Sequence, residues 1–384
     1  MSENVVNIKV FGVGGGGNNA VNRMAAMGID GVTLVAINTD KPVLNASDVE
    51  EKIAIGENTT KGRGAGANPE IGRMAAEESK EMIKEALVGV DMLYITAGMG
   101  GGTGTGAAPV IAEIAHNLGI LTVAVVTRPF AFEGKKRMMV AEDGIERLRK
   151  YVDALIVVSN EKLREISETP ISMRTAFAEA DNVLIGSVKS ICNVIYNTAF
   201  VNTDFADVTA ILKDAGDAHI GIGMASGPNK WEIAANQALS SPLLDTSIAG
   251  AEAIIVNLIA DEDIPFDEVT KISELITDQV PDAKVIWGMD FDKELKDNIQ
   301  VVVIATKTSK CDFTDEETAE TSATESKPSE NAGAAEAVTA EADVTAVETL
   351  EDEPIKKEET KKEWSFTDEE FEKIRTVANH SERK

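Results

Sequence analysis

The chain has 384 residues, of which 43% are hydrophobic and only 4% aromatic, and its formal net charge is −28. The length suffices for two domains with cores, and the composition suits an Ala/Val/Ile-rich α/β interior. The negative charge argues against direct binding of nucleic acid or an anionic membrane. No apolar run is long enough to span a bilayer, the N-terminus lacks the layout of a signal peptide, and the cysteines and histidines form no metal or redox motif. We therefore expect a soluble, cytoplasmic protein.

The N-terminal part reads as a strand, a glycine turn and a helix. Residues 7–13 are predicted to form a buried strand and residues 20–27 a helix, capped by Asn18 or Asn19. The turn between them matches the dinucleotide fingerprint G-x-G-x-x-G through Gly12, Gly14 and Gly17. Asp40, after the next predicted strand, has the spacing of an acid that binds a ribose hydroxyl. An NAD-binding oxidoreductase is therefore one candidate.

The longest glycine run, residues 98–106, lies between a predicted strand at 92–97 and a predicted helix at 107–118. Glycines allow positive φ and bring backbone N–H groups close to a ligand. The following helix adds unpaired N–H donors and the positive end of its dipole. A flexible linker is the alternative, but linkers rarely separate a buried strand from a helix. The run therefore predicts a phosphate cradle, and a third small-residue loop at 62–68 precedes a long amphipathic helix at 70–87.

Strands and helices alternate through the first half of the chain. Further strands are predicted at 121–127 and 154–158, with a charged helix at 133–150 between them. Such alternation predicts a mostly parallel, Rossmann-like sheet with right-handed crossovers. Ligands of these sheets bind outside the carboxyl ends of the strands, so the glycine loops are expected to converge on one edge.

The second half begins with a predicted long helix at 177–197, which carries Asp181 near its start, followed by the paired acids Asp204 and Asp207. An acid early in a helix usually compensates the dipole, and the acid pair is either a capped helix start or a group that orients a water or a cation. From about residue 218, shorter strands and helices predict a smaller α+β domain.

Five parts of the chain are expected. They are an α/β domain with the phosphate cradle (1–176), a central helix with its connecting loop (177–202), a C-terminal α+β domain that carries the acidic loop (203–310), a disordered acidic linker (311–363) and a partner-binding segment (364–384). The last segment combines a capping-box pattern with Trp364 and apolar residues at helical spacing, which favours a short docking helix over a frayed tail.

Two motifs far apart in the sequence resemble those of the tubulin/FtsZ superfamily. They are the run from Gly100 to Gly106 and the stretch from Asn202 to Val208. The resemblance extends over about residues 7–306 and implies a GTPase that binds GTP or GDP with Mg²⁺. It disfavours the NAD-binding reading, because a second glycine–threonine turn suits the phosphates of a mononucleotide. The chain has no G-x-x-x-x-G-K-[ST] motif, so the phosphate site lacks a P-loop lysine.

The resemblance assigns residues to each part of the nucleotide. The phosphates would meet Gly14, Gly15, Gly16, Gly17, Asn19, Ala65, Gly66, Gly101, Gly102, Thr103, Gly104, Thr105 and Gly106. The ribose side would be held by Glu133 and Arg137, and guanine would be recognised by Asn160, Phe177 and Asp181. The catalytic group would be Asn202, Asp204 and Asp207, with Mg²⁺ held through the phosphates and Asp204 as a further candidate ligand.

The resemblance also implies head-to-tail filaments in which the acids of one subunit reach the γ-phosphate of the next. It implies action at the midcell division site, with adaptor and regulatory proteins binding the C-terminal segment and the membrane reached only indirectly. Three departures are present: Thr203 replaces an aliphatic residue, Ala199-Phe200 replaces Pro-Gly, and the C-terminal end lacks the usual proline-containing apolar peptide. The altered loop leaves open a scaffold that binds GTP but hydrolyses it poorly.

Overall fold

The computed structural model describes residues 6–29, 31–162, 173–196, 205–240, 248, 250–291, 295 and 297–306, with no side chains described for 173–180 and 193. These residues belong to one compact unit, Met1–Asp315. The linker and C-terminal segment predicted at 311–384 lie outside the described residues. So do three residues of the predicted acidic loop, Asn202, Thr203 and Asp204.

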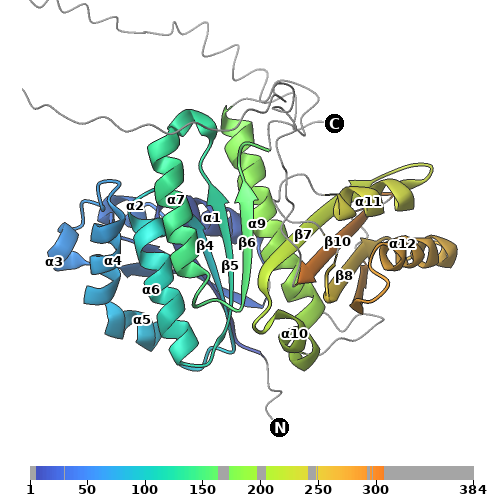
Figure 1. Cartoon of the computed structure of the whole chain (residues 1–384), viewed down its shortest axis with the longest axis horizontal. Helices are drawn as coiled ribbons and strands as arrows, with labels where there is room; N and C mark the ends of the chain where they lie inside the picture. The colour runs from blue at the N-terminus through green and yellow to red at the C-terminus, as the bar shows by residue number, and fades with distance from the viewer. Residues whose placement is uncertain are drawn as a thin grey trace, which may run out of the picture. The chain divides into compact units, whose positions relative to one another are not determined.

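A ten-stranded sheet runs through the described part of the chain in the order β3-β2-β1-β4-β5-β6-β7-β10-β8-β9 (Figure 1). Its first six strands are parallel: β1 (Ile8–Val13), β2 (Val32–Asn38), β3 (Glu51–Ala54), β4 (Met92–Gly98), β5 (Leu121–Arg128) and β6 (Ala154–Ser159). The other four are β7 (Gly216–Ala225), β8 (Ala253–Ala260), β9 (Lys284–Phe291) and β10 (Ile299–Thr306). Strand β10 runs antiparallel to β7 and β8, whereas β8 and β9 are parallel. The predicted mostly parallel α/β fold is therefore confirmed.

Helices cover both faces of the sheet, because successive side chains of the buried strands point to opposite sides. One apolar cluster contains Val10 of β1 and buried side chains of α1 (Gly14–Met27), α9 (Met173–Tyr196) and α10 (Phe205–Leu212). A second contains Phe11 of β1 and side chains of α4 (Pro69–Glu78), α5 (Lys80–Ala86), α6 (Thr103–Asn117) and α7 (Lys135–Leu148). A third joins β8 and β10 to α11 (Lys230–Leu239) and α12 (Phe266–Gln279). The short elements are α2 (Lys41–Asn45), α3 (Glu57–Thr60) and the 3-10 turn η1 (Ala131–Glu133).

Strand β7 joins the two halves of the sheet. It pairs with β6 in parallel over only two residue pairs, at Gly216 and Asp217. An ion pair between Arg149, just after α7, and Asp217 lies at the same place. The central helix α9 follows the prediction closely and packs its buried residues, among them Leu184 and Ile191, in the cluster under β1.

Several predicted helices differ from the observed ones in their bounds. The helix predicted at 107–118 already begins at Thr103, so the last part of the predicted glycine turn is helical. Helix α1 begins at Gly14 rather than at residue 20, and its N-cap position is Val13, so Asn18 does not act as a cap. The Asn18 amide instead donates to the carbonyl of Gly12 at 2.7 Å and accepts from Asn38 at 2.6 Å. These two bonds join residues at the ends of the neighbouring strands β1 and β2. The helix predicted at 70–87 is broken at Ser79, whose hydroxyl accepts a hydrogen bond from the backbone of Gly56.

Helices α4 and α6 approach so closely that the glycine between them has no room for a side chain. A Cβ on Gly106 would lie 2.0 Å from the carbonyl oxygen of Pro69 and 2.6 Å from the amide nitrogen of Arg73. We predict that Gly106→Ala lowers the free energy of unfolding by about 1–3 kcal/mol, the usual range for overpacking. Gly101→Ala is the matched control, since its Cβ would meet no atom within 4 Å. Equal melting temperatures for the two variants would contradict this account.

Candidate functional site

A cavity of about 350 Å³ opens where β1, β4, β5 and β6 end. Its walls come from the first turn of α1, the glycine turn after β4, the segments after β5 and β6, and the N-terminal half of α9. The lining residues are Gly15, Gly16, Asn19, Gly98, Met99, Gly101, Gly102, Thr103, Gly104, Thr127, Pro129, Glu133, Arg137, Asn160, Asp181 and Leu184. The glycine turns after β1 and β4 therefore meet at one edge of the sheet, as ligand sites of such sheets require.

The glycines of this cavity serve two physical purposes. At some positions two backbones touch: a Cβ on Gly14, whose φ is +72°, would lie 2.8 Å from the amide nitrogen of Gly104, and a Cβ on Gly102 would lie 3.0 Å from the amide nitrogen of Asn68. At Gly15 and Gly101 a Cβ would meet no atom within 4 Å, so these two leave the floor of the cavity open. Backbone N–H groups lie along this floor at the starts of α1 and α6, which suits an anion.

Buried side chains hold the turns in place without a ligand. The hydroxyls of Thr39 and Thr103 lie 2.6 Å apart and join the end of β2 to the start of α6. The Thr105 hydroxyl accepts from the backbone amide of Gly100 at 2.9 Å, which closes the turn after β4. Preorganised donors need no rearrangement when a charged ligand binds, so the geometry favours tight phosphate binding.

Glu133 and Arg137 lie together at the rim of the cavity, one turn apart. Arg137 donates to Glu133 at 3.0 Å, and the same carboxylate accepts from the backbone amide of Phe130 at 2.9 Å. The Glu133 side chain is 15% exposed, whereas that of Arg137 is 49% exposed. A fixed carboxylate beside a more exposed guanidinium provides an acceptor for a hydroxyl and a cation for a phosphate.

The opposite wall presents two oxygen acceptors. Asn160 is 5% exposed, and its Oδ1 has no hydrogen-bond partner within the described part of the chain. Burial raises the pKa of Asp181 to about 6, although Arg23 at 3.5 Å favours the ionised form. A buried acceptor without a partner costs free energy in the empty protein. Both groups thus fit a base edge with adjacent N–H donors, such as that of guanine.

The structure brings most of the predicted nucleotide-binding residues to this cavity. Eleven of them line it: Gly15, Gly16, Asn19, Gly101, Gly102, Thr103, Gly104, Glu133, Arg137, Asn160 and Asp181. Six others are not among its lining residues: Gly14, Gly17, Ala65, Gly66, Thr105 and Gly106. At least Gly17 and Gly106 are packing positions, because a Cβ there would meet backbone atoms at 2.3 and 2.0 Å. The side chain of Phe177 lies outside the described residues.

Sequence reasoning missed several residues at the same cavity. Thr127 and Pro129 follow β5, Leu184 lies one turn beyond Asp181, and Arg23 pairs with Asp181 from α1. The positions just after β5 carried a usable signal, since ligands meet the carboxyl ends of parallel strands. Arg23 carried none, because only the packing of α1 against α9 brings it to Asp181.

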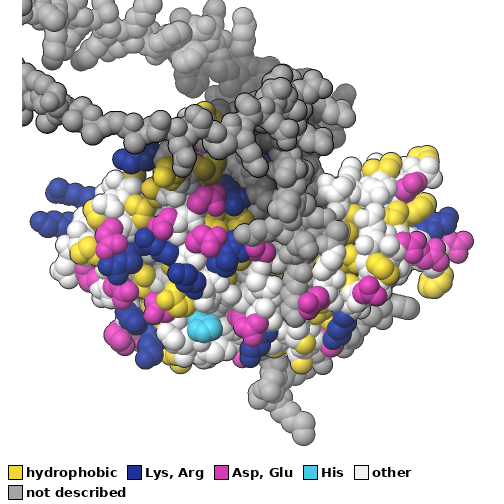
Figure 2. Space-filling model, in the orientation of Figure 1, with side chains coloured by type: hydrophobic (Ala, Val, Ile, Leu, Met, Phe, Trp, Pro, Cys, Tyr) yellow, Lys and Arg dark blue, Asp and Glu magenta, His cyan; other side chains and the backbone are white. Residues whose placement is uncertain are grey.

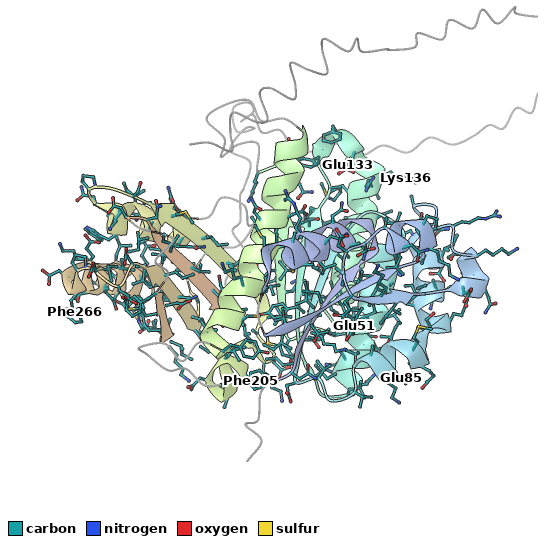
Figure 3. All side chains as sticks on the ribbon, turned by 180° about the vertical axis from the view of Figure 1, so that it is seen from behind. Glu51, Glu85, Glu133, Lys136, Phe205 and Phe266 are labelled. Carbon is teal, nitrogen blue, oxygen red and sulfur yellow. The ribbon has the colours of Figure 1, made fainter. Side chains whose placement is uncertain are left out.

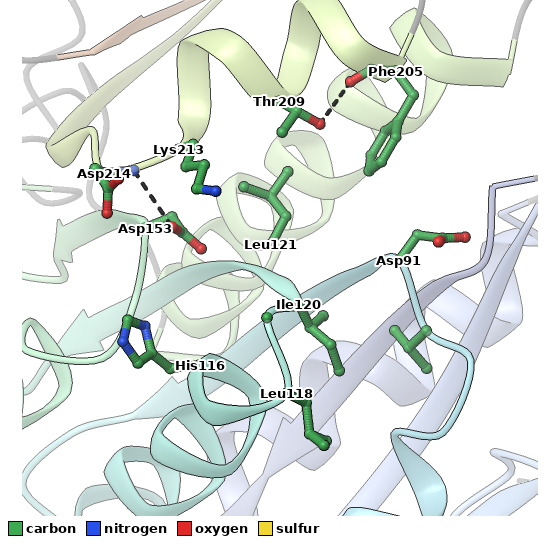
Figure 4. Close-up of a pocket in the computed structure, with 12 residues that line it drawn as sticks. Asp91, His116, Leu118, Ile120, Leu121, Asp153, Phe205, Thr209, Lys213 and Asp214 are labelled. Atoms are coloured by element: carbon green, nitrogen blue, oxygen red, sulfur yellow. Dashed lines mark hydrogen bonds between the residues drawn. The ribbon is translucent and has the colours of Figure 1, made fainter.

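Asp207, the described member of the predicted catalytic group, lies at the other end of the molecule. It belongs to α10, which lines a second cavity of about 420 Å³ with residues before β4 and β5, among them Asp91 and Ile120 (Figure 4). Figure 3 shows Phe205 of α10 and Glu133 at opposite ends of the sheet. Strands of seven and eight residues separate the two cavities, which is roughly 25 Å at about 3.3 Å per residue. Asp207 is therefore far from the glycine-lined cavity of its own chain.

Comparisons with known proteins agree with this geometry. The GTPase domain of the Tubulin/FtsZ family matches residues 7–168, and the C-terminal domain of the FtsZ family matches residues 216–309. The cell division protein FtsZ of Buchnera aphidicola subsp. Acyrthosiphon pisum (strain APS) is 52% identical over 308 residues, 80% of each chain.

Two solved structures of FtsZ from M. jannaschii share the fold. An empty dimer is 44% identical with a TM-score of 0.74 and covers 78% of this chain and 88% of its own. A mutant of the same protein is 43% identical with a TM-score of 0.75 and covers 79% and 91%. Fold and site thus define a tubulin-like GTPase. The chain belongs to the FtsZ family, and it is a cell division GTPase.

The surface of the described residues is mixed in charge. Figure 2 shows Lys and Arg side chains interspersed with Asp and Glu on the visible face. None of the helices in the described ranges has the length and apolar character needed to cross a bilayer.

The raised pKa of Asp181 predicts a pH-dependent effect on stability. Burial disfavours the ionised carboxyl of Asp181 and raises its pKa from 3.8 to about 6 in the folded protein. Ionised Asp181 therefore lowers the free energy of unfolding of the nucleotide-free protein above about pH 6. This loss of stability disappears as the pH falls from 6 toward 3.8. We expect Asp181→Asn to raise the melting temperature of the nucleotide-free protein at pH 7.5 and to raise it less at pH 5. The same increment at both values would show that Asp181 is not held at a raised pKa.

Proposed function

We propose that this chain is a GTP-dependent, self-assembling cytoskeletal GTPase that forms head-to-tail filaments and the division ring at midcell. The GTP bound by one subunit is hydrolysed when the acidic loop of the next subunit completes the site. The main support for the proposal is that the two parts of the proposed active site are far apart in one chain. The glycine-lined cavity and Asp207 lie at opposite ends of β4 and β5.

The glycine-lined cavity is assigned to the nucleotide. Its backbone N–H groups at the starts of α1 and α6 hold the phosphates, with Arg137 as the cation and Glu133 as the acceptor for a ribose hydroxyl. Asn160 and ionised Asp181 accept from the N–H donors of guanine, and Phe177 stacks on the base. Adenine offers an acceptor where guanine carries its N1–H, so it would leave buried acceptors without partners.

The hydrolytic group is assigned to the acidic loop of the next subunit. Asp204 and Asp207 polarise a water molecule, which adds to the γ-phosphorus as the bond to the β–γ bridging oxygen breaks, and Asn202 orients the two acids. The products are GDP and inorganic phosphate. Glycine-turn N–H groups stabilise charge on the phosphates. Mg²⁺ prefers oxygen ligands and, held through phosphate oxygens with Asp204 as a further candidate ligand, would neutralise developing charge.

Assembly follows from the placement of the two halves. A contact between unlike ends of two identical subunits is heterologous, and it continues as a filament unless the rotation between subunits closes a ring. The solved FtsZ of M. jannaschii is described as a dimer, which supports association between copies of this chain.

The remaining parts of the chain are assigned by the same proposal. Residues 1–176 hold most of the nucleotide site, 177–202 add Phe177 and Asp181 to it and lead on to the acidic loop, and 203–310 carry Asp204 and Asp207. Residues 311–363 act as a flexible acidic spacer, and 364–384 bind an adaptor protein that connects the filament to the membrane at the division site in the cytoplasm.

Replacing Asp207 tests the shared site. We expect Asp207→Ala to bind GTP within about twofold of the unsubstituted chain and to assemble, while phosphate release falls at least about 100-fold, the low end for loss of a group that moves a proton. Asp143→Ala, which removes an exposed acid from α7, is the matched control and should keep full turnover. Loss of GTP binding in Asp207→Ala, but not in the control, would contradict the assignment of Asp207 to hydrolysis alone.

Deletion of residues 364–384 tests the role of the C-terminal segment. GTP turnover and filament formation should stay unchanged in the purified protein, because no residue of the segment is assigned to nucleotide binding or hydrolysis. In cells the filaments should no longer collect at the division site. Normal ring placement by the truncated chain would refute the assignment.

A further inference from the structure

Tyr196, the last residue of α9, is bonded to the residues just before β1 through its hydroxyl. The O–H donates to the carbonyl oxygen of Val6 at 2.8 Å. Burial raises the pKa of Tyr196 to about 12, so the hydroxyl stays protonated at any working pH. Phenylalanine in this place would not make this bond.

The ring of Tyr196 is held as closely as its hydroxyl. Gly31 lies against it with a φ of +80°, and a Cβ there would come within 2.7 Å of two ring carbons. The ring packs at the edge of the apolar cluster that contains Ile8 and Cys192, the latter one helical turn earlier in α9. Hydroxyl and ring together leave the end of α9 little freedom to slide along β1.

Helix α9 is also fixed near its other end. There Asp181 pairs with Arg23 of α1 at 3.5 Å. Both anchors belong to the first strand–helix unit, because β1 leads directly through Val13 into α1. Strand β1 is itself paired in register with β2 and β4 along its whole length. The position of the end of α9 is therefore fixed relative to β1, the strand that leads into the first glycine turn.

Tyr196 is the last described residue before the acids. Residues 197–204 connect it to Phe205, where α10 begins, and Asp207 follows in that helix. We propose that Tyr196 is a positioning residue for GTP hydrolysis: by fixing the end of α9 on β1, it sets the point from which the chain leads to Asn202, Asp204 and Asp207. The inference rests on the proposed function, in which these acids serve the nucleotide of the neighbouring subunit.

Tyr196→Phe keeps the ring and removes the hydrogen bond to Val6. At saturating GTP we expect turnover per subunit to fall about 5- to 10-fold, the size that loss of one hydrogen bond predicts. The KM for GTP and the protein concentration at which turnover begins should stay unchanged, since neither the nucleotide cavity nor the amount of folded protein is altered. Tyr151→Phe, the same change elsewhere in the nucleotide-binding part, is the control and should have no effect.

Mixed filaments separate positioning from general damage. In a large excess of Asp207→Ala subunits, nearly all remaining turnover comes from GTP in an Asp207→Ala subunit served by the loop of the minor subunit. The minor subunit is either the unsubstituted chain or Tyr196→Phe. The reverse mixture places Tyr196→Phe in the Asp207→Ala subunits and keeps the minor subunit unsubstituted, so the substituted chain only presents its nucleotide.

The proposal predicts a 5- to 10-fold loss only when the Tyr196→Phe subunit donates the loop. Equal loss in both mixtures would mean a general structural role, and no loss in either would mean that the contact is dispensable; both results overturn the proposal. Failure of the shared-site mechanism itself is detected separately. It would appear in the unsubstituted protein, as turnover per subunit that does not depend on protein concentration.

Discussion

Contact between the backbones of two glycine turns is the constraint on which the rest of this structure depends. The turn after β1 lies directly on the turn after β4: a Cβ on Gly14 would meet the amide of Gly104 at 2.8 Å, and one on Gly16 would meet that of Gly98 at 3.1 Å. This approach is possible only without side chains, and only because β1 and β4 are neighbours in the sheet. It brings the first turns of α1 and α6 to one place and so creates the phosphate cradle. The contact between the buried hydroxyls of Thr39 and Thr103 then holds the start of α6 against the end of β2.

The length of the parallel strands separates the glycine-lined cavity from the acids that we propose for hydrolysis. The nucleotide cavity occupies the carboxyl ends of β4 and β5, whereas α10 with Asp207 lies by their amino ends. In the proposed mechanism the chain holds GTP at one end and offers acids at the other, so assembly is the step that completes the site. Helix α9 connects the two ends and is held near both of them, by Asp181 and by Tyr196.

Sequence reasoning was most successful where local pattern and chemistry agree. Buried strands followed by glycine turns identified the parallel sheet and the phosphate end of the cavity, because the carboxyl ends of parallel strands share an edge. The family resemblance supplied Glu133, Arg137, Asn160 and Asp181. It failed where tertiary contacts determine the bounds of a helix or the partner of a side chain. Helix α1 starts at Gly14, and Asn18, expected as its cap, instead bonds to residues at the ends of β1 and β2.

Long-range contacts explain the other misses. Ser79 interrupts the helix predicted at 70–87 by bonding to Gly56, 23 residues away. The ion pair between Arg23 and Asp181 joins residues 158 positions apart, and no periodicity in either segment could reveal it.

The most direct test of the shared site is phosphate release from GTP with Mg²⁺ over a series of protein concentrations. The account predicts a rate per subunit near zero below a threshold concentration and a rise above it, because an isolated subunit holds GTP far from its own acids. A rate per subunit that is independent of concentration would mean that each monomer completes its own site, and it would contradict the account.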